Sequence, residues 1–281
     1  MEVRNPAAPH FYAGDCARAT QRFLQGFAAP MLPERVVAGI VPHAGWQFSG
    51  AVAARVFESI RQKEKPETFI IFGAVHRWAG INAVYARGAW ATPLGNVEID
   101  EKLAQQILEA TPQWTANEPK AHSGEHSIEV QLPFIKYLFP QAQAIPISVN
   151  PDARAVLLGE RIGEILKNHN RPTVVIGSTD LTHYGAVYAF TPVGYGPRAH
   201  EWVCENDFRL LRLVEQMAVS EILPEAKQHQ NACGAGALAA TVAAAQVLGA
   251  ERGYLIEHTT SYDVLPEGEF QMGVGYAGML F

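Results

Sequence analysis

The chain has 281 residues, of which 48% are hydrophobic and 18% are charged, and its formal net charge at pH 7 is -6. This composition is enough for a large core, and an acidic chain without a basic cluster does not favour a nucleic-acid-binding protein. The start has no apolar signal segment, Ala235–Ala250 is too short to span a bilayer, and three scattered cysteines indicate no disulfide framework, so we expect a cytoplasmic protein with no membrane partner.

Short apolar runs bounded by glycine or proline recur along the chain and are typical of buried parallel strands. The predicted strands are Val36–Val41, Phe69–Phe72, Ala144–Val149, Thr173–Gly177, Tyr254–Ser261 and Gly273–Phe281. The predicted helices are Gly50–Lys63, Glu101–Ala110, Ile128–Leu138, Asp152–Asn168, Pro197–Met217 and Cys233–Leu248. This alternation predicts an α/β fold, in which residues 1–281 form a single domain with a central parallel or mixed sheet flanked by helices.

Three of the predicted strands are followed by a histidine. The first leads to His43, the second to His76, and the strand Thr173–Gly177 leads to Asp180 and His183. In open α/β sheets the ligand crevice lies outside the carboxyl ends of the strands. A single loop histidine often only bonds to the backbone, and Asp180 is alternatively a helix N-cap, but the repeated placement favours one shared site.

Cys233 is the candidate thiol for this site. It precedes the alanine-rich helix, where free backbone N–H groups favour thiolate over thiol. The structural alternative is a small buried cysteine that only packs. Imidazoles that meet a thiolate and a carboxylate would form a transition-metal site.

A further cluster lies in the stretch from His122 to Glu129, with His126 and Glu129 about one helical turn apart. Both side chains could face the same pocket, and an ion pair at a helix start is the alternative. Pro133 lies inside the helical pattern that follows, so we expect a kink or an early break there.

Five motifs in this order carry a family resemblance: Pro42-His43-Ala44-Gly45, Gly73-Ala74-Val75-His76, Glu125-His126-Ser127-Ile128-Glu129, Ser178-Thr179-Asp180-Leu181-Thr182-His183-Tyr184-Gly185 and Ala232-Cys233-Gly234. Nearly the whole chain resembles the Memo family, also called AmmeMemoRadiSam system protein B. That family is similar in fold to LigB-like class III extradiol dioxygenases, which hold non-haem Fe(II) in an α/β domain.

The resemblance implies a role for each matching residue. His43, His76 and Cys233 correspond to metal ligands. The remaining matches stand beside the metal or line its cleft, and are Asp180, His183, His126 and Glu129. Because a thiolate replaces the dioxygenase carboxylate, copper and zinc compete with Fe(II), which we expect first. An oxidisable thiolate also argues against ordinary ring cleavage.

The predicted function is that of a metal-dependent oxidoreductase on an unknown small substrate, with His183 held by Asp180 as a proton shuttle. One alternative is a non-catalytic adaptor that binds phosphorylated or anionic peptides, as animal members of the family are described. Another is a metal-dependent hydrolase. The second family name also implies radical-SAM and AMMECR-type proteins as partners.

Overall fold

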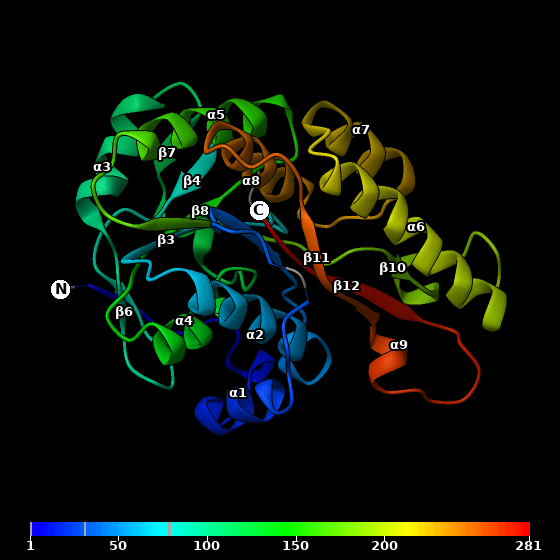
Figure 1. Cartoon of the computed structure of the whole chain (residues 1–281). Helices are drawn as coiled ribbons and strands as arrows, with labels where there is room; N and C mark the ends of the chain where they lie inside the picture. Colours follow the sequence, from blue (N-terminus) through cyan, green and yellow to red (C-terminus); the bar gives the residue numbers. More distant parts are fainter. Residues whose placement is uncertain (1, 31, 78–79) are drawn as a thin grey trace.

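A computed structural model of the chain describes residues 2–30, 32–77 and 80–281. Within these residues a nine-stranded sheet has the strand order β10-β12-β2-β9-β3-β8-β4-β7, with β11 also paired to β12 (Figure 1). Its strands are β2 (Ala38–Val41), β3 (Thr68–Gly73), β4 (Asn82–Val84), β7 (Thr115–Asn117), β8 (Gln143–Ser148), β9 (Thr173–Ser178), β10 (His183–Tyr184), β11 (Tyr254–Thr260) and β12 (Gly273–Leu280). A small second sheet contains β1 (Val3–Arg4), β5 (Ala89–Trp90) and β6 (Val97–Glu98).

The four predicted central strands are confirmed, and they lie side by side as β2, β9, β3 and β8. All three pairings between them are parallel. Helices cover both faces of this part of the sheet, which explains why its strands are continuous apolar runs. The flanking strands β12, β11 and β4 pair antiparallel to their neighbours, so the sheet is mixed.

The helices form a layer on each face of the sheet (Figure 1). On one face, α8 packs on β2, β3 and β9 and is covered by α5. In the other layer, α2 packs on β2 and β12 and contacts α1 and α4. The α-helices are α1 (Cys16–Leu24), α2 (Trp46–Lys63), α3 (Glu101–Ala110), α4 (Leu132–Leu138), α5 (Ala153–Lys167), α6 (Pro197–Glu215), α7 (Val219–His229), α8 (Ala235–Val247) and α9 (Ser261–Val264). No helix in the described ranges is both long enough and apolar enough to cross a membrane.

Helices α5 and α8 approach each other closely because both present small side chains. A Cβ atom added to Gly159 of α5 would lie 2.1 Å from the backbone oxygen of Ala240 in α8. Only glycine fits at 159, and the contact fixes the position of α8 relative to the sheet. The turn that precedes α8 is thereby held near the carboxyl ends of the strands.

Three local predictions need correction. The helix after β2 begins at Trp46, immediately after the turn that carries His43. The segment predicted as one helix from Ile128 begins with a short 3-10 helix, Glu129–Gln131, and continues as α4. Pro133 lies in the first turn of α4, where its missing N–H has no helical partner in any case, so it starts the helix instead of kinking it.

Candidate metal centre

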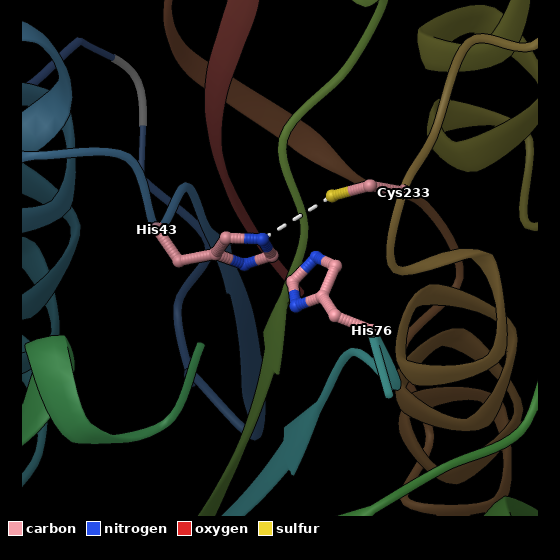
Figure 2. A group of neighbouring side chains, drawn as sticks. All are labelled: His43, His76 and Cys233. Carbon is pink, nitrogen blue, oxygen red and sulfur yellow. Dashed lines mark hydrogen bonds between the residues drawn. The ribbon is translucent and has the colours of Figure 1, made fainter. Parts of the chain in front are cut away.

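His43, His76 and Cys233 converge at the carboxyl edge of the central strands. His43 follows β2, His76 follows β3, and Cys233 lies in the turn before α8. One nitrogen of each ring and the sulfur lie within 4.8 Å of one another. Figure 2 shows the two rings and the thiol, each from a different segment, pointing toward one another. The parallel arrangement of β2 and β3 thus brings together side chains that are far apart in sequence.

The ring of His43 is held so that Nε2 faces the cluster. Its Nδ1 lies 3.0 Å from the hydroxyl oxygen of Ser178, and that hydroxyl donates to the carbonyl oxygen of Ser127 at 2.8 Å. Since the hydroxyl has one proton, the Nδ1–H of His43 is the donor toward Ser178. Nε2 therefore carries a lone pair, as a metal ligand requires.

His76 is oriented by the buried carboxylate of Glu125. Both carboxylate oxygens lie 3.1 Å from Nδ1 of His76. An ionised carboxylate only accepts hydrogen bonds, so Nδ1 donates and Nε2 keeps its lone pair. The same carboxylate accepts from the backbone N–H groups of His76, His126 and Ser127. A carboxylate behind a ligating imidazole fixes its tautomer and increases its basicity.

The hydrogen bonds between Glu125 and His76 shift the pKa of both side chains. Burial opposes ionisation of Glu125, but the hydrogen bonds from His76 and the backbone outweigh it and hold the pKa of the carboxyl far below its usual range. In return, the hydrogen bond to Glu125 raises the pKa of His76. His43 behaves oppositely, because burial and repulsion from His76 lower its pKa to about 3. His43 is therefore neutral at physiological pH.

Cys233 lies directly against His43. Its Sγ is 3.2 Å from Nε2 of His43, and the backbone N–H of Asp180 donates to Sγ at 3.3 Å. A Cβ atom on Gly234 would lie 2.4 Å from the carbonyl oxygen of Ser178. Glycine at 234 is thus what allows the turn to bring Cys233 so close to the end of β9.

The surroundings of Cys233 oppose the acidity that was expected from a helix N-terminus. The helix α8 begins two residues later, at Ala235. Burial, together with the nearby carboxyl of Asp180, raises the pKa of the Cys233 thiol. The raised pKa favours the protonated thiol, and an ion bound at Sγ would have to displace that proton.

This donor set fits a transition-metal ion. Bonds of about 2.0–2.3 Å from an ion to nitrogen and sulfur separate neighbouring ligand atoms by about 3–4 Å. Atoms that already lie within 4.8 Å of one another need only a small movement to reach that spacing. Two imidazoles and a thiolate suit iron, copper and zinc, and exclude ions that prefer only oxygen ligands.

Asp180 and His183 lie beside Cys233, and the three form a second group of ligand-type atoms within 4.8 Å of one another. Asp180 accepts the backbone N–H of His43 at 2.6 Å, and burial raises its pKa. The prediction that Asp180 holds His183 is wrong, because Nδ1 of His183 is instead 3.0 Å from the carbonyl oxygen of Leu181. With Nδ1 as the donor, Nε2 of His183 keeps its lone pair.

His126 also belongs to the site. Its ring stacks on the ring of His76 with centroids 5.0 Å apart and an angle of 7°. With Glu125, these two histidines form another group of ligand-type atoms within 4.8 Å of one another. Burial and repulsion from His43 lower the pKa of His126 to about 4, so it is neutral at physiological pH.

Glu129 is not brought to the site with His126. Its carboxylate accepts from the guanidinium of Arg4 at 2.7 Å, from the hydroxyl of Tyr12 at 3.0 Å and from the backbone N–H groups of Ala7 and Ala8. These contacts hold the N-terminal segment against the rest of the chain. The structure therefore gives Glu129 an anchoring position and not the predicted place in the cleft.

Sequence reasoning missed two residues behind the ligands, Ser178 and Glu125. Glu125 stands in the motif with His126, so an acidic residue between ligand-type histidines was the available signal. Ser178 gave a weaker signal, because it is the residue that follows the predicted strand Thr173–Gly177. Its role follows from the sheet register, in which Ser178 pairs with Val41 and so lies next to the turn that carries His43.

Comparison with known proteins agrees with this fold. Residues 4–280 match the family model described as Memo-like protein. The chain is 36% identical to a MEMO1 family protein of Thermococcus onnurineus, covering 99% of each chain, and 34% identical to one of Pyrococcus furiosus, covering 100% of this chain and 99% of that protein. A crystal structure of an uncharacterized protein from Escherichia coli K12 shares the fold, with a TM-score of 0.54 and 10% identity over 87% of this chain and 99% of that one. The chain therefore belongs to the Memo-like protein family.

Proposed function

We propose that this protein binds one transition-metal ion through Nε2 of His43, Nε2 of His76 and Sγ of Cys233, and that the loaded protein is an oxidoreductase acting on a small substrate. The observation that carries the proposal is the tautomer of the two imidazoles, in which Nδ1 carries the proton and Nε2 the lone pair. Each Nδ1–H is already used, one by Ser178 and the other by Glu125, which leaves both Nε2 lone pairs for an ion. Nε2 of His43 lies 3.2 Å from Sγ of Cys233, and a ring nitrogen of His76 lies within 4.8 Å of both.

The surroundings of the cluster support access for a substrate. The side chains of His76 and His126 are 33% and 22% exposed, whereas that of His43 is 2% exposed. The site therefore opens on the side of His76 and His126. Three protein ligands leave coordination positions free, where a bound iron or copper ion would supply one-electron chemistry with O2 and a substrate.

Two groups beside Cys233 can manage protons. Burial raises the pKa of Asp180, so its carboxyl holds a proton more readily than an exposed aspartate does. The ring of His183 is fixed through Nδ1, which leaves Nε2 to accept a proton. These two residues are proposed to give and take protons at a substrate next to Cys233.

Fe(II) is the first candidate ion, and copper and zinc follow because the thiolate is a soft ligand. Anaerobic purification, elemental analysis and titration with each metal test this directly. We expect one ion per chain for the wild type, and no stoichiometric binding by the double variant His43→Ala, Cys233→Ala. Cys204→Ala, which removes a thiol elsewhere, is the matched control and should bind as the wild type does. Full metal content in the double variant would refute the assignment of ligands.

The redox part of the proposal needs its own test. Iron- or copper-loaded protein with ascorbate should consume O2 faster than the same amount of free metal, and zinc-loaded protein should not. Cys233→Ala, supplied with equal metal, should match free metal. If the wild type binds iron or copper stoichiometrically but consumes no O2, the metal site stands and the oxidoreductase function is refuted.

A further inference from the structure

A cavity of about 1040 Å³ lies between α5, α7 and α8. Both α5 and α7 pack against α8, as Figure 1 shows at the top of the molecule. The wall is mostly apolar and includes Val156, Leu157, Val219, Leu223, Pro224 and Ala232. The cavity is open to solvent on one side, and its size and apolar wall suit a small organic ligand.

The charge left free in the cavity is positive. Two charged residues line it, Asp152 and Lys227. The carboxylate of Asp152 is already engaged by the guanidinium and the backbone N–H of Arg154. Lys227 is exposed and has no hydrogen bond or ion pair with any part of the chain that the structure describes. A ligand with an apolar body and one negative charge would therefore match both the wall and the free ammonium group.

We propose that this cavity binds a small organic anion with an apolar body, of the kind represented by a medium-chain carboxylate. Cys233 is part of the wall, while its sulfur contacts His43 on the other side of the same turn. The ligand would thus lie against the segment that carries the thiol of the metal centre. Binding of this anion requires no metal, so it does not depend on the proposed function of the metal centre.

The test is calorimetric titration of metal-free protein with decanoate, and with decanol as the neutral molecule of the same chain length. We expect saturable binding of one decanoate per chain, and weaker binding of decanol. Leu157→Glu places a negative charge on the apolar wall and should weaken decanoate binding about tenfold or more. Lys227→Ala should weaken decanoate binding about threefold to fivefold and leave decanol unchanged, since an exposed ion pair contributes only a little to binding.

Both variants change exposed side chains, so the fold is expected to persist. Leu265→Glu and Lys102→Ala make the same changes at exposed positions away from the cavity, and should bind decanoate as the wild type does. The proposal is overturned if the wild type shows no saturable binding, or if Leu157→Glu binds as tightly as Leu265→Glu. Equal loss of decanoate and decanol in Lys227→Ala would overturn the assignment of an anionic ligand. Loss of metal binding in the experiments above would leave these outcomes untouched.

Discussion

At the scale of single residues, the candidate centre depends as much on the groups behind the imidazoles as on the imidazoles themselves. The convergence of His43, His76 and Cys233 could be predicted, because each follows or precedes an element whose pattern is clear in the sequence. The parts played by Ser178 and Glu125 could not, because they depend on which ring nitrogen faces which neighbour. The prediction that Glu129 faces the same pocket as His126 is wrong for a related reason. The backbone between His126 and the 3-10 helix is irregular, so the spacing of the two residues does not place them on one face.

Ser178→Ala tests the residue behind His43. It removes the acceptor of the Nδ1–H, so the ring is free to rotate and to change tautomer. We expect metal affinity to fall about 10- to 100-fold, the usual effect of losing such a support. Titration with Zn²⁺ measures this, and Ser148→Ala, a buried serine at the end of β8, is the control. Unchanged affinity in Ser178→Ala would show that this hydrogen bond does not prepare His43 as a ligand.

The pH dependence of metal binding follows from the raised pKa of Cys233 and the low pKa of His43. At neutral pH the thiol is protonated and His43 is not, so an ion must displace one thiol proton. Affinity should therefore rise with pH, by about tenfold per unit from about pH 7 to 8. Below the raised pKa of His76 a second proton competes, and the slope should steepen. Affinity is measured by competition with a chelator of known pH dependence. An affinity that does not change with pH would mean that metal binding releases no proton from Cys233.

At the scale of elements, the prediction succeeds where burial makes the pattern unambiguous. The strands β2, β3, β8 and β9 are buried on both faces, and α3 has the bounds that its pattern predicts. It fails for β1, β5 and β6, because strands of two residues carry no period and their pairing is decided by distant residues. The closeness of α5 to α8 likewise depends on glycines with distant neighbours, such as Gly159, which lies against Ala240, 81 residues away.

Gly159→Ala tests that contact. The added Cβ meets the backbone oxygen of Ala240, which cannot move aside as a flexible side chain can, so α5 must shift away from α8. We expect a loss of about 2–3 kcal/mol in the free energy of unfolding, measured with urea. Gly14→Ala is the control, since its Cβ meets nothing within 4 Å. If both variants are equally stable, the close packing of the two helices is not what positions α8.

At the scale of the whole molecule, the N-terminal segment is attached to the body through the buried carboxylate of Glu129. Arg4 also donates to the carbonyl oxygens of His122 and Glu125, so the same anchor reaches the segment that supports His76. This long-range attachment joins residues more than 115 positions apart, as the separations of its hydrogen bonds show. No periodicity in the sequence predicts this attachment.

Glu129→Gln separates anchoring from metal binding. The amide keeps the shape but removes the charge that pairs with Arg4, and it turns one acceptor into a donor facing backbone N–H groups. We expect a loss of about 2–4 kcal/mol in the free energy of unfolding, and faster tryptic cleavage near the N-terminus, with metal affinity within about threefold of the wild type. A large loss of metal affinity without a loss of stability would place Glu129 in the site after all.

The central claim, that two imidazoles and one thiol hold a single ion, is tested most directly by X-ray absorption spectroscopy of the metal-loaded protein. The account predicts one sulfur neighbour at about 2.3 Å and two imidazole nitrogens at about 2.0–2.1 Å. Loss of the sulfur contribution in Cys233→Ala should follow. A spectrum with no sulfur neighbour, or one that Cys233→Ala leaves unchanged, would contradict it.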